Sequence, residues 1–299
     1  MTEVKIVLAG EVWKNSPEVI DKLYSIPPTE PVIINTVTEG FSLGAVGVLK
    51  VLDRWVQDTG RSPDTVKIDT PNQFEKTNYE FLGPRPLHFL LESHVSKYHV
   101  PPRNVIQSGH LFGFFVGNYR PMRNAIARDI LTMYRQHFLI SVMRCNLIPD
   151  QFWDPDIYAI GSIDNQQVED QYKPDAPNTN YSLLQFYNQF EIELVSETFW
   201  HGQTFFPTEK TVRPIVGCRP MLINGPIDFL DNLKQLGYKT FDQLWPEEYD
   251  RSEGQTRWNQ IKLTIDYIIE HGYDRNLANE IVQYNYNLLQ ETISQEQYG

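Results

Sequence analysis

The strongest constraint on the fold of this chain is its repeated change between short β-branched runs and segments of helical periodicity. The clearest run, residues 31–37, is β-branched and continuous, as in a buried parallel strand. Helical periodicity follows over residues 43–57, with Ser42 as the expected N-cap and Gly60 as the stop. Strands that alternate with helices in this way predict a parallel sheet.

The same alternation continues along the chain and defines its organisation. We predict further strands at residues 4–8, 65–70, 111–117, 139–144, 189–196 and 220–224, and helices at 87–98, 122–137, 211–216 and 228–236. The pattern favours an α/β fold of two Rossmann-type domains with parallel sheets facing a cleft, where ligands bind at the carboxyl ends of strands. The expected units are residues 1–105, residues 106–250 and a helical tail over residues 251–299.

Composition limits the possible partners and the compartment. The chain has 299 residues, with 26 basic and 38 acidic side chains and a net charge of −12, which disfavours wrapping of nucleic acid over a generic basic surface. Six arginines between residues 101 and 149 still permit a local basic groove. Two cysteines and the lack of a membrane-length apolar run predict a cytoplasmic protein with free thiols and no membrane partner.

Two groups of polar residues fall where a strand is predicted to end and a helix to begin. Arg120 and Arg123 lie at such a boundary, where free helix amides and the helix dipole favour phosphate. Arginine beside such a site suits a bidentate grip on phosphate oxygens. We therefore expect both arginines to bind a phosphate group.

The second group follows the strand predicted at residues 189–196. Glu197 ends that strand, while Glu209 and Lys210 open the next helix. A carboxylate there can accept from ribose hydroxyls, and the ammonium beside it can neutralise a diphosphate. Thr211 would add a hydroxyl contact and Arg213 a second cation. Fixed cations would stabilise a diphosphate leaving group, because its charge grows as the bond breaks.

These segments resemble a known family. The runs Phe-Glu-Ile-Glu-Leu-Val-Ser-Glu-Thr, Thr-Glu-Lys-Thr-Val-Arg-Pro-Ile and Arg-Pro-Met-Leu-Ile are similar to the donor-binding domain of α1,3-fucosyltransferases and related GT-B glycosyltransferases. The run from Phe115 through Asn118 to Arg123 is similar to the strand, Asn, arginine and helix that open this domain. Residues 237–242 and 247–250 also resemble phage-type glycosyltransferase-like proteins.

The resemblance covers roughly residues 111–245 and implies a GT-B-like fold with a GDP-sugar-like donor. It implies that Glu209 lies near the ribose and that Lys210 and Arg123 lie near the diphosphate, with Asn118 at the same site. The expected co-substrate is a GDP- or UDP-linked sugar, of hexosyl or fucosyl type, with no other cofactor.

An inverting sugar transfer requires a base that deprotonates the acceptor hydroxyl. We expect the first domain to supply it. Glu39 is the first candidate, because it follows a predicted strand and precedes Gly40. Asp69, at the end of the third strand, is the second candidate, and His110 is the third.

A metal site is not predicted. The histidines and cysteines show no metal-ligand spacing. Asp154-Pro155-Asp156 has the spacing of a metal-binding Asp-x-Asp in GT-A enzymes, but it follows no long apolar strand and contains a proline.

Together these features predict a metal-independent, inverting glycosyltransferase that moves a sugar from a nucleotide-diphospho sugar to an acceptor hydroxyl. Two alternatives remain open from the sequence. One is transfer to a hydroxymethylated pyrimidine in phage DNA, which the arginine-rich segment permits. The other is a non-catalytic nucleotide- or glycan-binding module that keeps the fold without the chemistry.

Overall fold

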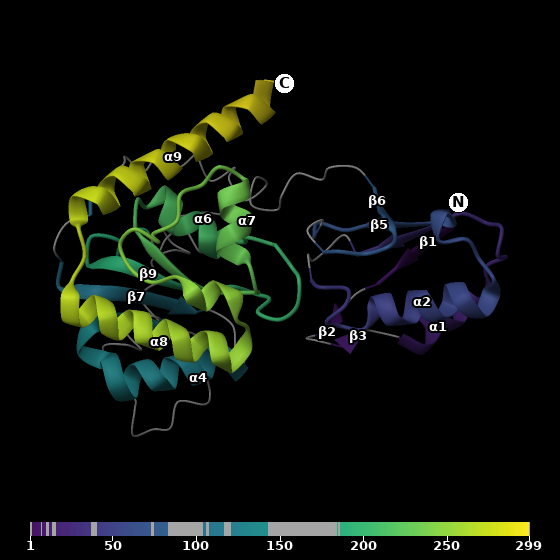
Figure 1. Cartoon of the computed structure of the whole chain (residues 1–299), viewed down its shortest axis with the longest axis horizontal. Coiled ribbons are helices and arrows are strands. Elements are labelled where there is room, and N and C mark those ends of the chain that lie inside the picture. Colours follow the sequence, from purple (N-terminus) through teal and green to yellow (C-terminus); the bar gives the residue numbers. More distant parts are fainter. Residues whose placement is uncertain are drawn as a thin grey trace, which may run out of the picture.

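The structure is a computed structural model of the chain, and it describes residues 2–6, 8–9, 12–13, 16–36, 41–72, 75–82, 104–105, 108–116, 121–142, 184 and 186–298. These residues form two α/β units, each with a parallel sheet and its own hydrophobic core (Figure 1). The predicted α/β class and the two parallel sheets are thereby confirmed.

The first unit contains a four-stranded sheet in the order β1-β4-β5-β6, with every neighbouring pair parallel. Its strands are β1 (Thr2–Lys5), β4 (Val32–Asn35), β5 (Val66–Asp69) and β6 (Glu80–Phe81). The helices α1 (Ser16–Ser25) and α2 (Val48–Thr59) lie side by side on one face of this sheet (Figure 1). The unit also contains a short hairpin, β2 (Leu8–Ala9) with β3 (Val12–Trp13), and a 3-10 turn, η1 (Pro63–Thr65).

Helix α2 begins five residues later than the sequence predicts. Ser42 Oγ accepts from the Ala45 N–H at 3.1 Å, as an N-cap does, and its hydroxyl donates to Glu75 Oε1 at 2.7 Å, but residues 43–47 form a separate turn instead of the first turn of the helix. Gly47 then adopts φ +78°, and α2 starts at the next residue. The predicted stop is confirmed, since Gly60 takes the left-handed conformation that ends many helices.

The second unit contains a four-stranded parallel sheet in the order β10-β9-β7-β8. Its strands are β7 (His110–Val116), β8 (Phe138–Val142), β9 (Phe190–Ser196) and β10 (Met221–Asn224). In Figure 1, α4 (Pro121–Asp129) and α8 (Gly254–His271) cover one face, while α6 (Glu209–Val216), α7 (Phe229–Gln235) and α9 (Arg275–Tyr298) lie on the other.

The two C-terminal helices belong to the core of the second unit. Trp258 and Ile261 of α8, and Ala278 and Ile281 of α9, are buried in the same apolar cluster as the strands of the second sheet. The two helices are separated at Gly272, which has φ +69°. Helices α8 and α9 thus contribute buried side chains, up to Ile293, to the hydrophobic core around the sheet.

Other predicted elements differ in detail. The helix predicted over residues 122–137 is α4 followed by a π-helical segment, Ile130–Tyr134, and a 3-10 turn, Arg135–His137. Helix α1 and strand β6 were not predicted, and a 3-10 turn, Glu248–Arg251, precedes α8. The helix predicted at residues 87–98 and the polar segment 150–182 lie outside the described residues.

The strand order of the second sheet fixes the place where a ligand can bind. From the central pair β7 and β9, the chain continues to β8 on one side and to β10 on the other. In open parallel sheets, ligands bind at the carboxyl ends of the two strands where the order reverses in this way. Helix α4 follows β7 and α6 follows β9, so both helices begin at this edge.

Candidate functional site

The candidate site lies at the carboxyl ends of β7 and β9, where the first turns of α4 and α6 carry one basic side chain each. On α4 this residue is Arg123, which is only 4% exposed. Its Nη2 donates to the carbonyl oxygens of Ser196, at 3.2 Å, and Glu197, at 3.1 Å. The guanidinium therefore reaches from one strand-helix boundary to the end of the neighbouring strand.

On α6 the basic residue is Lys210. Thr208 is the N-cap of this helix and accepts from the Lys210 backbone N–H at 3.3 Å. The Lys210 ammonium donates back to the Thr208 hydroxyl at 3.3 Å and to the Thr198 hydroxyl at 3.4 Å. This geometry holds a partly buried ammonium over the positive end of the α6 dipole.

Arg123 and Lys210 thus contact the same short segment, residues 196–198, although they come from different helices. Two cations and a helix N-terminus at one strand end form a region of positive potential. An anionic group with several oxygens, such as a diphosphate, would suit the charge of these two side chains.

Glu197 is buried among protein groups, whereas the sequence suggests a carboxylate that accepts from ribose hydroxyls. It is 2% exposed and accepts from the Thr208 N–H at 3.1 Å, the Thr208 hydroxyl at 2.7 Å, the Thr211 hydroxyl at 2.5 Å and the Thr198 N–H at 3.2 Å. Glu197 and the fully buried Thr211 therefore hold α6 against the end of β9. In this structure their polar groups face each other inside the protein.

Arg213 lies deeper, in the core of the second unit. Its guanidinium pairs with Glu193 of β9 and donates to the Tyr187 hydroxyl at 3.0 Å, and both partners are fully buried. Burial opposes the charged form of Arg213, but the Glu193 carboxylate raises its pKa overall. The second cation expected for a diphosphate is therefore engaged in a buried ion pair away from the edge.

The remaining predicted residues divide into two groups. Asp69 ends β5 as predicted, at the carboxyl edge of the first sheet, but it is only 7% exposed. Glu209 opens α6 as predicted, and its side chain lies outside the described part of the chain. Glu39, Asn118 and Arg120 also lie outside the described residues.

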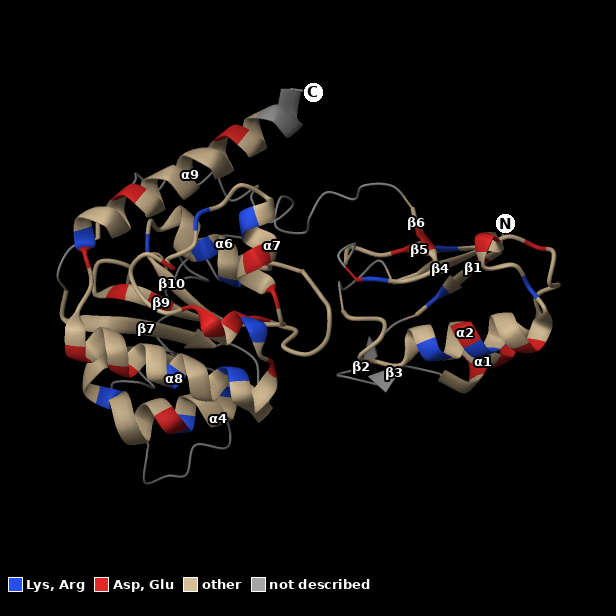
Figure 2. Ribbon diagram, viewed as in Figure 1, with Lys and Arg blue, Asp and Glu red and all other residues tan. Residues whose placement is uncertain are grey.

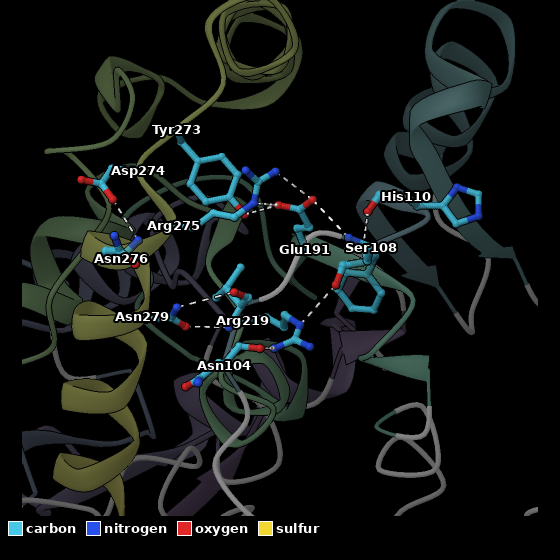
Figure 3. Close-up of polar contacts among 12 residues, drawn as sticks. Asn104, Ser108, His110, Glu191, Arg219, Tyr273, Asp274, Arg275, Asn276 and Asn279 are labelled. Carbon is cyan, nitrogen blue, oxygen red and sulfur yellow. Dashed lines mark hydrogen bonds and ion pairs between the residues drawn. The ribbon is translucent and has the colours of Figure 1, made fainter.

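His110 opens β7 and therefore lies at the opposite, amino edge of the second sheet. Figure 3 shows its ring directed away from a polar cluster centred on Glu191. Burial lowers the pKa of the His110 imidazole. This position is distant along the strand from the start of α4, so His110 does not join the candidate site.

The amino-edge cluster has the character of a structural anchor. Glu191 accepts from the Tyr273 hydroxyl at 2.7 Å and from Arg275 Nε at 2.8 Å, as Figure 3 shows. Burial, followed by the hydrogen bond to Glu191, raises the pKa of Tyr273. These contacts attach the turn before α9 to the start of β9.

One residue that sequence reasoning missed connects the two units. Asn72, just after β5, is fully buried, and its side chain contacts the backbone of Gln203 at 3.0 Å and Phe205 at 3.1 Å. The carboxyl edge of the first sheet is thereby joined to the segment that follows β9. In the sequence, Pro71-Asn72 has the composition of an ordinary turn, so no local signal marks it.

Three further observations concern partners. Figure 2 shows acidic and basic residues mixed along α2, which carries Lys50, Asp53, Arg54 and Asp58. Among the described residues, His, Cys, Asp and Glu form no group of three or more that could hold a metal ion. None of the helices in the described ranges combines the length and apolar character needed to cross a membrane.

The fold and the site define an α/β protein with two parallel sheets and a cluster of basic residues at the switch point of the second sheet. In comparisons with known proteins, no protein-family model and no curated protein matches this chain.

Proposed function

We propose that this protein is a GT-B-like glycosyltransferase that uses a nucleotide-diphospho sugar. The sugar donor would bind at the carboxyl edge of the second sheet, and the first unit would bind the acceptor hydroxyl. The observation that carries the proposal is the contact of both Arg123 and Lys210 with residues 196–198, where a helix N-terminus adds positive potential.

In this mechanism the diphosphate is the leaving group. Lys210 would contact its oxygens directly, because its ammonium is partly exposed at the first turn of α6. Arg123 would add positive charge from its buried position beside the carboxyl end of β9. Charge grows on the diphosphate as the glycosidic bond breaks, so fixed cations stabilise the transition state more than the bound substrate.

The structure also refines the proposed roles of the neighbouring residues. Glu197 and Thr211 would position the start of α6, rather than contact the nucleotide, because their polar groups bind each other. Arg213 leaves the proposed site, because it is paired with Glu193. For the catalytic base, Glu39 remains the first proposal, with Asp69 as the second.

A non-catalytic nucleotide-binding module is the second candidate function. The burial of Asp69 favours it, since a general base must come within hydrogen-bond reach of the acceptor. Both candidates require the same diphosphate site and differ only in whether sugar is transferred. Transfer to a hydroxymethylated pyrimidine in DNA is a choice of acceptor within the first function.

The deciding experiment compares Lys210→Ala with Lys262→Ala. Lys262 is also a partly buried helical lysine, but it pairs with Asp129 at 3.2 Å and lies on α8. GDP and UDP should raise the melting temperature of the wild type and of Lys262→Ala. Lys210→Ala should bind about tenfold or more weakly, because it loses a charge-assisted contact to phosphate.

Sugar transfer is then assayed with GDP- and UDP-sugars on glycan and hydroxymethylated DNA acceptors, with and without EDTA. Transfer that resists EDTA and disappears in Lys210→Ala would support the proposal. Nucleotide binding without hydrolysis or transfer would favour the binding module. Equal nucleotide binding by Lys210→Ala and the wild type would remove Lys210 from the site and contradict both candidates.

A further inference from the structure

The segment that follows β9, residues 199–206, forms a bridge between the two units. Phe199 packs against the core of the first unit, and its ring meets that of Phe41 at 6.3 Å in an edge-on arrangement. Trp200 and Phe205 instead pack in the core of the second unit, where the Phe205 ring lies 5.1 Å from that of Phe229. This bridging segment therefore has apolar contacts on both sides.

Asn72 holds the bridging segment to the first unit through hydrogen bonds. Its Nδ2 donates to the Gln203 carbonyl at 3.0 Å, and its Oδ1 accepts from the Phe205 N–H at 3.1 Å. The same Nδ2 lies 3.4 Å from the Phe41 carbonyl of its own unit. A single buried amide thus satisfies a backbone donor and a backbone acceptor more than 125 residues away in the chain.

Gly202 shows independently how closely the two units approach. It adopts φ +72°, and a Cβ built on it would lie 2.6 Å from Ser42 Oγ and 2.7 Å from Ala45 Cβ. Only glycine fits this position without moving the first unit or the segment. On the other side, the Gly202 N–H donates to Glu253 of the second unit at 2.9 Å.

Both ends of the bridging segment meet at Lys210. Thr198 precedes the segment, Thr208 follows it, and the hydroxyl of each accepts from the Lys210 ammonium. A ligand that contacts this ammonium therefore lies beside both stems of a segment whose middle is fixed to the first unit. The position of the first unit relative to the ligand then depends on the contacts of Asn72.

We propose that Asn72 is a positioning residue that places the acceptor side of the molecule against the sugar donor at Lys210, through residues 199–206. The inference rests on the proposed function. It adds a residue that neither contacts the diphosphate nor supplies the base, and it explains why a fully buried amide joins two units that have separate cores.

The test uses Asn72→Ala with a matched control, Asn285→Ala. Asn285 is also buried and also satisfies a backbone N–H and carbonyl, both of Lys239 at 2.8 Å, but all of these groups lie in the second unit. Both substitutions remove the same chemistry. Only the first removes a contact between the units, so a difference between the variants reports positioning rather than general loss of stability.

Hydrogen exchange is measured by mass spectrometry on the full chain, with and without GDP or UDP. In the ligand-free protein, Asn72→Ala should speed exchange at Phe205 by about tenfold, because that N–H loses its acceptor. In the wild type and in Asn285→Ala, nucleotide should protect both α6 and residues 42–48 of the first unit. In Asn72→Ala, protection should remain at α6 and be lost at residues 42–48.

Each outcome separates the two proposals. If nucleotide protects no part of the wild type, the proposed function fails and the positioning role falls with it. If α6 is protected in every variant but residues 42–48 respond in Asn72→Ala as they do in the wild type, only the role of Asn72 is overturned. Unchanged exchange at Phe205 in the ligand-free variant would overturn it as well.

A second pair of variants covers the case in which Asn72→Ala does not fold. Gly202→Ala introduces a Cβ against Ser42 and Ala45, whereas Gly60→Ala has a similar positive φ, +65°, with no atom within 4 Å of the added Cβ. Both carry the same kind of backbone strain. Gly202→Ala should lose the nucleotide response at residues 42–48, and Gly60→Ala should keep it. An equal response in both would contradict the inference.

Discussion

The two ends of strand β9 each carry a buried glutamate, and the two residues are stabilised in different ways. Glu191, at the amino end, pairs with Arg275 and accepts from the Tyr273 hydroxyl. Glu197, just after the carboxyl end, accepts from the hydroxyls of Thr208 and Thr211 and from backbone amides. At one end a cation stabilises the carboxylate, and at the other a helix N-terminus does.

This difference follows from the direction of the strands. Helices that follow parallel strands begin at the carboxyl edge, where their free amides favour negative charge. Glu197 uses those amides, while Arg123 and Lys210 donate to neutral carbonyl and hydroxyl oxygens at the same edge. The comparison teaches that the helix N-termini and the two basic side chains gather at one end of this sheet, whereas the contacts at the other end attach α9.

Between these residues, Glu193 faces the interior and pairs with Arg213 of α6. Burial raises the pKa of Glu193, while the Arg213 guanidinium acts against that rise. Glu191 and Glu193 are two residues apart in β9 and therefore point to the same face of the sheet. The strand and the residue just after it thus carry an anchor, a buried ion pair and a contact with the N-cap of α6 in succession.

The largest effect along this strand is expected in its middle. Arg213→Met should lower the free energy of unfolding by about 3–5 kcal/mol, because it leaves the Glu193 carboxylate buried without its cation. The loss should be smaller near about pH 5 than near about pH 8. The remaining carboxyl has a folded-state pKa raised above its unfolded value, so its stability contribution is present at low pH and is lost as pH rises.

Urea unfolding at the two pH values measures this effect. The control is Glu193→Gln with Arg213→Met, which removes both charges and keeps an acceptor for the Tyr187 hydroxyl. The double variant should recover most of the lost free energy of unfolding, because no charge is then left buried without a partner. If Arg213→Met were as stable as the wild type at both pH values, the buried ion pair would have no structural role.

The second effect is expected at the carboxyl end of β9. Glu197→Gln should lower the free energy of unfolding by about 2 kcal/mol. Each oxygen of the carboxylate accepts a backbone N–H, one from Thr208 and one from Thr198, so the NH₂ group of Gln would face one of these donors without an acceptor. Because Glu197 contacts Thr208, the N-cap of α6, the start of this helix should shift in the variant. The variant should therefore also bind GDP and UDP more weakly than the wild type.

Thermal unfolding gives the stability change, and calorimetric titration gives the nucleotide affinity. Glu197→Asp serves as the control, because it keeps the charge but shortens the reach to α6. It should also weaken nucleotide binding if the position of the helix start matters. Unchanged affinity in Glu197→Gln would separate the cap from the proposed diphosphate site.

Much of this arrangement is predictable from the sequence, because it depends on local signals. A continuous β-branched run predicted β4, residues 189–196 were predicted as the strand that is β9, and Glu209 and Lys210 were expected to open the helix that is α6. The convergence of Arg123 and Lys210 follows the same logic, since helices after neighbouring parallel strands begin at the same edge.

The remaining features depend on contacts between distant residues. Nothing near Arg213 in the sequence indicates that Glu193 lies beside it, and Asn72 meets its partners only after both sheets have formed. Ser42 accepts from the Ala45 N–H as an N-cap would and also donates to Glu75, yet α2 begins only after Gly47. Arg213 and Asn72 therefore leave no local signal because their partners are distant in the sequence, while at Ser42 a local preference is present but a turn forms where the helix was expected.

The smallest effect is expected at the amino end of β9, where Glu191→Gln applies the same substitution as at Glu197. This substitution should lower the free energy of unfolding by about 1 kcal/mol. The carbonyl of Gln still accepts from the Tyr273 hydroxyl, and the Arg275 side chain, which is 41% exposed, can be solvated by water. Nucleotide affinity should equal that of the wild type, since this residue lies at the far end of the strand from Lys210.

The comparison of the two ends is contradicted if Glu191→Gln lowers nucleotide affinity as much as Glu197→Gln does. Such a result would mean that the whole strand transmits strain to the start of α6, because the two substitutions would then act alike despite their different partners. Exchange at the turn before α9 provides the internal check. It should speed up in Glu191→Gln and stay unchanged in Glu197→Gln, because only the former loosens the anchor of that helix.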